Sequence, residues 1–226
     1  MQNSYKRIDA HLSSLGYCTR SEAKKFLRIF ELTVNDKRVF DTSIKAYHND
    51  IKVNNEVLDP EIITILLNKP SGFICSHNDA GSLIYALIPS RWNRRNPKIS
   101  TIGRLDVDTT GAIILTDDGA LNHKLSSPKS DVSKIYEATL AVPLNGDEKE
   151  IFASGELMLN GEKKPLLPAV LEVISETHVR LEIVEGKYHQ VKRMFAAVGN
   201  RVLSLHRVSF GGFMVDDLKE GEYKFI

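Results

Sequence analysis

The chain is organised around the stretch GRLDVDTTGAIILTDDG, which spans residues 103–119. Its apolar run at 112–115 predicts a buried strand, because short and strongly apolar runs are typical of strands packed inside a core. The Asp-Asp-Gly turn at 117–119 predicts a helix over 120–125 with Asp118 as its N-cap. Asp106 therefore precedes core structure directly, in a short polar loop where a functional side chain can be held in place.

The residue type alone does not assign a role to Asp106. An Asp in a turn most often accepts hydrogen bonds from its own backbone, and this interpretation stays open at the level of residue type. The pattern around it is more informative. Gly-Arg-Leu-Asp-x-Asp-Thr-x-Gly, followed by Leu-Thr-x-Asp-Gly, resembles the signature of the pseudouridine synthases of the small-ribosomal-subunit type. This resemblance implies that Asp106 is the essential catalytic residue.

Three further motifs resemble the same family, at residues 68–72 (Asn-Lys-Pro-x-Gly), 134–136 (Lys-x-Tyr) and 185–200. The resemblance implies that Tyr136 lies in the active site and that Lys192 neighbours Asp106. Arg104, next to Asp106 in the loop, is placed to contact phosphate or to hold a target nucleotide that is flipped out of its helix, with a salt bridge inside the loop as the alternative. The resemblance extends over nearly the whole chain, and the last motif is typical of the branch that modifies 16S rRNA.

The first 60 residues predict a small module of their own. Ile8, Leu12 and Leu15 have helical spacing, and Gly16 can end that helix. Thr-Arg-Ser-Glu at 19–22 predicts a capping box before a second helix, and short strands are expected at 32–34, 37–40 and 51–53. The order resembles the S4-like RNA-binding domain. That resemblance implies phosphate contacts from the basic residues of the second helix, namely Arg20, Lys24, Lys25 and Arg28.

Three positions depart from the S4-like pattern: Ile29, Glu31 and Asp36. Glu31 weakens local attraction to phosphate, so a plain packing module remains the alternative interpretation. The Asp-Pro step at 59–60 favours an extended linker. We therefore expect domains at 1–60 and 61–226. The predicted fold class is α+β, with the small S4-like domain followed by a catalytic domain built on a mixed, mainly antiparallel sheet.

Composition narrows the function classes. The chain has 226 residues, 42% of them hydrophobic, and no apolar run of membrane-spanning length, so we expect a cytoplasmic protein that contacts no membrane. Cys18 and Cys75 have no motif around them and are expected to be thiols. The seven histidines are scattered, which argues against a metal site.

The charge distribution favours a polyanionic partner. The formal net charge is only +1, but residues 91–104 and 187–207 each contain five basic residues and no acidic one. Two such runs near the motifs indicate RNA, and we count Arg193 among the RNA-binding candidates. The expected partner is 16S rRNA or an assembling small subunit, and the protein is expected to be a monomer.

The implied reaction breaks the bond from ribose to uracil nitrogen and rejoins the base through carbon 5. No group enters or leaves, so no cofactor is expected. An ionised Asp106 can attack the anomeric carbon, add to the uracil ring or abstract a ribose proton, and these routes stay open. Three alternatives remain: a synthase acting on 23S rRNA, a non-catalytic RNA-binding assembly factor, and a glycosidase using Asp106 with Asp108.

Overall fold

The structure is a computed structural model that describes residues 3–127 and 130–226. The chain folds as two compact units. The first unit comprises Met1–Thr64, Tyr85–Ser100 and Leu115–Asn122, and the second comprises Ile65–Ile84, Thr101–Ile114 and His123–Ile226. The expected division after residue 60 stays a prediction.

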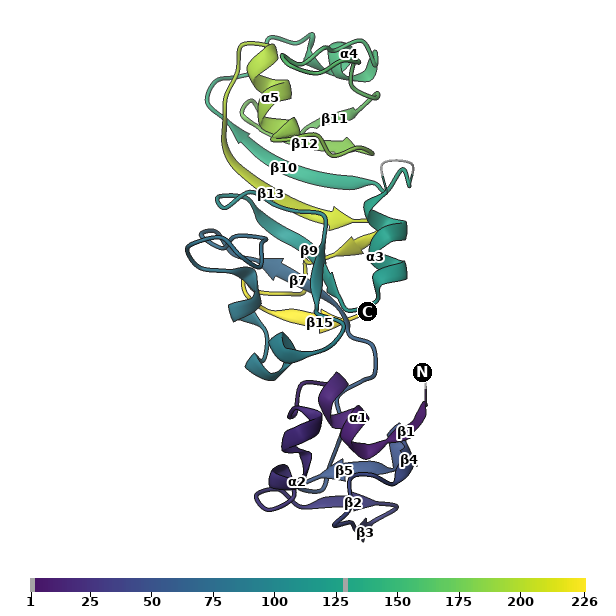
Figure 1. The fold of residues 1–226 in the computed structure, drawn as a ribbon. Helices are drawn as coiled ribbons and strands as arrows, with labels where there is room; N and C mark the ends of the chain where they lie inside the picture. Colours follow the sequence, from purple (N-terminus) through teal and green to yellow (C-terminus); the bar gives the residue numbers. More distant parts are fainter. Residues whose placement is uncertain (1–2, 128–129) are drawn as a thin grey trace. The chain divides into compact units, whose positions relative to one another are not determined.

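The N-terminal module, residues 3–58 of the first unit, contains two short helices and two small antiparallel sheets (Figure 1). Strand β1 (Tyr5–Arg7) pairs with β4 (Lys45–Tyr47). The second sheet has the order β3-β2-β5-β6, with β2 at Leu32–Val34 and β5 at Ile51–Val53 as predicted. The remaining elements are α1 (Ile8–Ser14), a 3-10 turn (Arg20–Glu22), α2 (Ala23–Phe26), β3 (Lys37–Arg38), a 3-10 turn (His48–Asp50) and β6 (Glu56–Val57).

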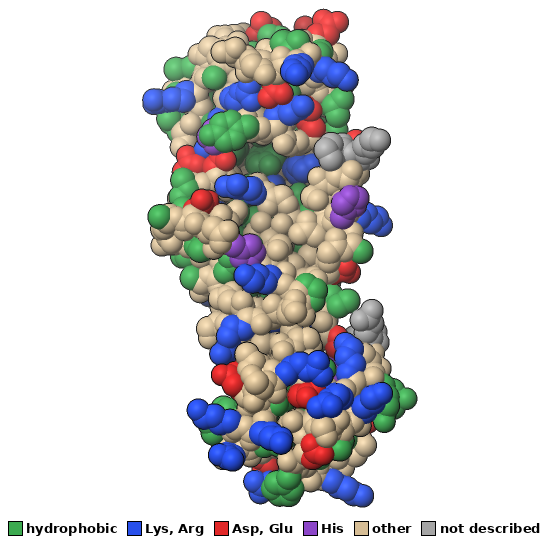
Figure 2. All heavy atoms as spheres, viewed as in Figure 1, with side chains coloured by type: hydrophobic (Ala, Val, Ile, Leu, Met, Phe, Trp, Pro, Cys, Tyr) green, Lys and Arg blue, Asp and Glu red, His purple; other side chains and the backbone are tan. Residues whose placement is uncertain are grey.

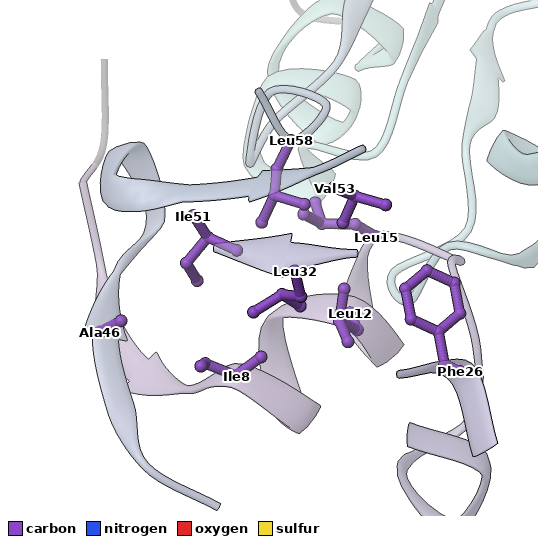
Figure 3. Packing of buried hydrophobic residues seen from close by; sticks show 9 residues of the cluster. All are labelled: Ile8, Leu12, Leu15, Phe26, Leu32, Ala46, Ile51, Val53 and Leu58. Atoms are coloured by element: carbon purple, nitrogen blue, oxygen red, sulfur yellow. The ribbon is translucent and has the colours of Figure 1, made fainter. Parts of the chain in front are cut away.

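Local sequence explains these elements. The predicted capping box is present: Thr19 accepts from the backbone of Glu22, and the Glu22 side chain accepts from the backbone of Thr19. Asn35 and Asp36 have positive φ angles of 50° and 60°, which closes the two-residue turn between β2 and β3. One cluster of apolar side chains joins the helices to the sheet (Figure 3), made by Ile8, Leu12, Leu15, Phe26, Leu32, Ala46, Ile51, Val53 and Leu58.

A larger sheet of nine strands forms the framework of the rest of the chain. Its order is β11-β12-β10-β13-β9-β7-β15, with β8 beside β9 and β14 beside β13. Most neighbours are antiparallel, and β13 runs parallel to β9, so the predicted mixed and mainly antiparallel sheet is confirmed. The strands are β7 (Thr64–Lys69), β8 (Ser100–Ile102), β9 (Thr110–Thr116), β10 (Lys134–Leu140), β11 (Val170–Val173), β12 (His178–Ile183), β13 (Val202–Phe210), β14 (Phe213–Met214) and β15 (Tyr223–Phe225).

Helices α4 (Glu148–Ala153) and α5 (Gln190–Ala197) pack together at the β11 and β12 end of this sheet (Figure 1). Their contact is an edge-to-face pair of Phe152 and Phe195, whose ring centroids are 5.3 Å apart. Helix α3 (Gly119–Ser126) follows β9, and Asp118 accepts from the backbone N–H groups of Ala120 and Leu121 as an N-cap. The cap predicted for this helix is therefore confirmed.

The basic run at 91–104, which was counted toward an RNA surface, contains one basic residue that is buried. A 3-10 turn covers Ser90–Arg94, and the next residue, Arg95, is only 2% exposed. Its guanidinium binds Asp117 at 2.7 Å and donates to two backbone carbonyls at residues 60 and 61. Asp59 is held in the same unit by Arg91 and the indole N–H of Trp92. Two arginines counted toward an RNA surface are thus structural ion pairs.

In the described part of the chain, no helix is long and apolar enough to cross a membrane. Cys75 is buried and Cys18 is partly buried, and both are free thiols, as expected.

Candidate active site

The loop between β8 and β9 carries Asp106. It turns back at once, with the backbone N–H of Thr109 donating to the carbonyl of Asp106 at 3.2 Å. Leu105 is 6% exposed and anchors the loop in the core, whereas the Asp106 carboxylate is 29% exposed. The apolar neighbour fixes the backbone, and the acidic side chain stays accessible to a ligand.

Lys69, the last residue of β7, holds the backbone of this loop through hydrogen bonds from the core. It is fully buried, and its ammonium group donates to the backbone carbonyls of Pro70, Asp106, Val107 and Thr109 at 2.8 to 3.3 Å. The backbone N–H of Gly72 adds a bond to the Val107 carbonyl at 2.8 Å. Burial lowers the pKa of Lys69. The Asn-Lys-Pro-x-Gly motif therefore acts on the Asp106 loop by holding its backbone.

Two side chains from the start of α5 reach the Asp106 carboxylate. Lys192 Nζ lies 3.1 Å from Asp106 Oδ2 and 2.7 Å from Asp108 Oδ1, and His189 Nε2 lies 3.2 Å from Asp106 Oδ1. Burial alone would lower the pKa of Lys192, but its hydrogen bonds to Asp108 and Asp106 outweigh burial and raise that pKa. The bond from Lys192 in turn lowers the pKa of Asp108. One ammonium group thus serves two carboxylates.

The backbone of His189 is set apart from its neighbours. It has φ 46° and ψ 36°, a left-handed conformation that is uncommon for a residue with a side chain. Its ring stacks on Tyr188 with centroids 3.8 Å apart, and Tyr188 is 75% exposed. Strained backbone of this kind is concentrated at functional sites, and here it aims the imidazole at Asp106.

A cavity of about 620 Å³ adjoins these groups, and Asp106, His189 and Lys192 line it together with Tyr136 and Arg207. The volume is within the range of small-ligand sites, so one nucleotide can be enclosed. Figure 2 shows a hollow in this part of the molecule with Lys, Arg and acidic side chains at its rim.

The wall of the cavity is built where β9, β13 and β10 lie side by side. A Cβ atom at Gly111 would come within 2.2 Å of the Arg207 carbonyl, and Gly111 has φ 104°, so only glycine fits there. This close approach lets the Arg207 side chain cross to β9, where its Nε donates to the Ala112 carbonyl at 2.6 Å. On the other side, Arg207 donates to the Tyr136 hydroxyl at 3.3 Å.

Comparison with known proteins identifies the family. A family model described as RNA pseudouridylate synthase matches residues 63–197, which include the Asp106 loop, Tyr136 and the start of α5. This chain is a member of that family.

Its relatives match almost from end to end. The ribosomal small subunit pseudouridine synthase A of Escherichia coli (strain K12) is 49% identical over 96% of this chain and 95% of its own length. The enzyme of the same name from Pasteurella multocida (strain Pm70) is 42% identical over 96% and 94%. A crystal structure of a pseudouridylate synthase aligns with a TM-score of 0.69 at 40% identity, covering 98% of this chain and 96% of that one. The protein is a pseudouridine synthase.

Some of the site residues expected from the sequence line the cavity of this pseudouridine synthase, and others do not. Asp106, Arg104, Tyr136 and Lys192 all line one cavity. Arg193 is not among the residues that line this cavity. Its guanidinium binds Glu162 at 3.1 Å and donates to the carbonyls of Asn160 and Tyr188. The four basic residues of the N-terminal module, Arg20, Lys24, Lys25 and Arg28, are exposed. Only Lys24 and Lys25 lie on α2, which is shorter than expected; Arg20 lies in the preceding 3-10 turn, where it binds Asp9 at 3.3 Å, and Arg28 follows the helix. The roles assigned to all of these residues stay predictions.

Sequence reasoning missed several contributors to the synthase site. His189 lies in the motif at 185–200 but was given no role, and its neighbours Tyr188 and Gln190 do not indicate a left-handed backbone. Lys69 was part of a motif that also fits a polar turn, and only its four carbonyl partners disclose what it does. Arg207 was counted as a surface charge, although it is only 2% exposed. The buried positions Leu205, Arg207 and Ser209 alternate along β13, but they share no apolar character, so the sequence carried no signal that Arg207 is buried.

Over residues 3–127 and 130–226, no group of three or more His, Cys, Asp or Glu side chains is arranged to hold a metal ion.

Proposed function

We propose that this pseudouridine synthase converts a uridine of the small-subunit 16S rRNA to pseudouridine, with Asp106 as the acting carboxylate. The observation that carries the catalytic assignment is the position of Asp106. Its carboxylate lies on a fastened loop, lines a nucleotide-sized cavity and contacts Lys192 and His189. The substrate assignment is supported by relatives at 40–49% identity that are named for the small ribosomal subunit.

The reaction needs the target base outside its helix, because Asp106 cannot reach a stacked nucleotide. Flipping costs about a few kcal/mol in unstacking and unpairing. Contacts in the cavity can offset part of that free-energy cost, because the aromatic rings of Tyr136 and Phe210 line it and can pack against the base. Enclosure also keeps the detached uracil beside the ribose until the new bond forms.

Lys192 and His189 orient the Asp106 carboxylate for this chemistry. Each oxygen has one partner, Oδ2 with Lys192 and Oδ1 with His189. Fixed partners hold the carboxylate in one rotamer, and such preorganisation lowers the cost of reaching the transition state. The three routes open to an ionised carboxylate all start from this orientation, so the arrangement serves each of them.

The test of the proposed function is modification of the RNA itself. Wild-type protein is incubated with 16S rRNA and with 23S rRNA carrying tritium on uracil carbon 5, and tritium release is followed by mapping of the modified position. We expect release from one uridine in 16S rRNA. Release from 23S rRNA alone would assign the protein to the large subunit, and binding without release would make it an RNA-binding factor.

We further propose that the preferred substrate is a partly assembled small subunit. RNA helices are recognised mainly by shape and backbone, and one uridine offers little sequence to read. Turnover is compared on free 16S rRNA, on the same RNA bound by early ribosomal proteins, and on a hairpin of the target loop. Equal turnover on all three would mean that local sequence is sufficient.

A further inference from the structure

Arg207 is a buried cation without a counterion. It is 2% exposed, and among the described residues no carboxylate lies within ion-pair distance of it. Its guanidinium has two hydrogen-bond partners, the Ala112 carbonyl and the Tyr136 hydroxyl. Its third nitrogen, Nη2, is buried and has no hydrogen-bond partner among the described residues. An unpaired buried charge is costly, so its retention calls for a functional explanation.

Arg95 shows how the same chain treats a buried arginine that serves structure alone. It is equally buried and also has one guanidinium nitrogen, Nη1, without a partner, but its Nε binds the Asp117 carboxylate at 2.7 Å, so its charge is paired where that of Arg207 is not. Arg207 instead lies against aromatic faces, with its guanidinium carbon 4.9 Å from the centre of the Phe210 ring and 5.8 Å from that of Tyr136. Both rings line the cavity beside Asp106.

The charges near the cavity leave this side of it positive. Lys192 is shared by Asp106 and Asp108. Lys134, on the cavity wall, donates to the backbone carbonyls of Val132 and Val184 and has no ion pair among the described residues, although Glu185 also lines the cavity. Burial, and then the charge of Arg207, lower the pKa of Lys134. The cavity wall at Arg207 is therefore suited to an occupant that is planar and negatively charged.

The proposed reaction produces such a species. When the bond between uracil N1 and ribose C1′ breaks, its electron pair stays with the base, and the charge spreads over N1 and the carbonyl oxygens. Carbon 5 then bonds to C1′, loses its hydrogen as a proton, and N1 gains a proton, so no co-reactant is needed. A delocalised planar anion is weakly hydrated and matches a guanidinium better than a phosphate does in a buried site.

We propose that Arg207 stabilises the negative charge of the detached uracil. A fixed cation can do so through the whole rearrangement, because a half-turn of uracil about its N3–C6 axis exchanges the two carbonyl oxygens. Whichever oxygen faces Arg207 before the turn is replaced by the other after it. Stabilisation by a preorganised charge in a water-poor cavity is among the largest effects available to an enzyme.

The inference rests on the proposed reaction and is independent of which RNA is modified. Wild-type conversion is therefore measured first, on the RNA that it modifies. A wild type that converts no uridine removes the proposed function, and the Arg207 assignment is then judged only after an active substrate is in hand. Two versions of that substrate are made, with uridine or 5-fluorouridine at the target. Fluorine withdraws electrons and makes the departing base a more stable anion.

The readout is the ratio of the two single-turnover rates of N1–C1′ cleavage, which does not depend on the fraction of active enzyme. In Arg207→Met, which removes the charge, we expect the preference for 5-fluorouridine to rise at least about tenfold over wild type. Arg207→Lys, which keeps a charge, should change the ratio by less than about threefold. Arg201→Met removes an exposed cation next to the same strand and should leave the ratio unchanged.

Equal slowing of both substrates by Arg207→Met would assign Arg207 a structural role and overturn the proposal. A Tyr136→Phe variant that raises the ratio as much as Arg207→Met would also overturn it, because the charge would then act through the tyrosine hydroxyl. If Arg207→Met does not fold, Arg207→Gln carries the same test, since it removes the charge and keeps amide donors.

Discussion

The N-terminal module and the second unit use lysine and arginine in opposite ways. In the module, Lys24, Lys25 and Arg28 are exposed, and Figure 2 shows Lys and Arg side chains spread over the face of the module that is in view. In the second unit, Lys69 is 0% exposed and donates to backbone carbonyls, and Arg207 is 2% exposed and lies against aromatic rings. The first arrangement leaves charge exposed to solvent, and the second uses charge to hold the Asp106 loop and to build the cavity wall.

This difference shows why a run of basic residues is a weak indicator of an RNA surface. Of the five basic residues between 187 and 207, Lys187 and Arg193 bind Glu162, Lys192 binds Asp106 and Asp108, and Arg207 is buried. Lys187 is still 39% exposed, and Arg201 is the exposed residue of the five for which no ion pair is found in the described part of the chain. Surface charge requires an exposed helix or loop in addition to the residue type. The predictions below separate charges that hold the site from charges that attract RNA.

The largest effect is expected from the acidic partner of this charge network. Asp106→Asn should reduce pseudouridine formation by at least about 1,000-fold while RNA binding and folding stay close to wild type, because the amide cannot replace an ionised carboxylate. Single-turnover tritium release measures it. Asp147→Asn, which alters an exposed acidic residue ahead of α4, is the matched control. Retention of a tenth of wild-type turnover by Asp106→Asn would rule out Asp106 as the acting group.

A substitution of Lys69 tests whether a buried cation that is not part of the cavity lining affects stability and turnover. Lys69→Met leaves carbonyls of the Asp106 loop without their shared donor, and should lower the free energy of unfolding by about 3 kcal/mol. Turnover should fall as well, because the loop is no longer fastened. Urea unfolding followed by circular dichroism gives the stability, and Lys149→Met on the surface of α4 is the control. If Lys69→Met had the stability and turnover of wild type, the Asp106 loop would keep its conformation without Lys69.

Sequence reasoning was most successful where local chemistry determines structure. The capping box at Thr19 and the N-cap at Asp118 each depend on a few neighbouring residues, and both are present. The Asp106 loop was identified through its motif, and the structure adds the physical reasons for two motif positions. Gly111 is required by the close approach of Arg207, and Lys69 by the carbonyls that it binds.

What could not be predicted depends on pairing between distant segments. The long strand β13 was not expected, because its exposed outer positions conceal the alternation. The ion pair of Arg95 with Asp117 joins residues 22 apart, and no local pattern distinguishes it from a surface charge. His189 meets Asp106 only after α5 and the β8–β9 loop have come together. A single sequence contains no direct record of such contacts.

The module's charges should affect binding and leave chemistry untouched. Replacing Arg20, Lys24, Lys25 and Arg28 together by Gln should weaken binding to rRNA by about tenfold at moderate salt and reduce the salt slope by about 3. Turnover at saturating RNA should stay at the wild-type level. Filter binding across a salt series measures the slope, and a Lys149→Gln, Lys219→Gln double variant controls for general loss of exposed charge. An unchanged slope would mean that the module does not contact phosphate.

The smallest effect is expected at Asp108, where a charge pair is largely exposed. The hydrogen bond from Lys192 lowers the pKa of Asp108 below its ordinary value of 3.8, so the folded state gains stability from its ionised form. That gain is complete above 3.8 and is lost as the pH falls through the folded-state pKa. Asp108→Asn should therefore be slightly less stable than wild type at pH 7, and the difference should vanish at lower pH.

The size of that difference is limited because the Asp108 side chain is 65% exposed and Lys192 keeps Asp106 as a second partner. Urea midpoints of wild type and Asp108→Asn are compared at pH 7, 5, 4 and 3. At alkaline pH the dependence of stability on pH has the opposite sign. Because the pKa of Lys192 is raised in the folded state, its charged form stabilises the fold fully below the ordinary value of 10.5. That stabilisation is lost as the pH rises through the folded-state pKa. A difference between the two proteins that persisted unchanged once the pH had fallen through the folded-state pKa of Asp108 would come from packing, since both side chains at position 108 are then neutral.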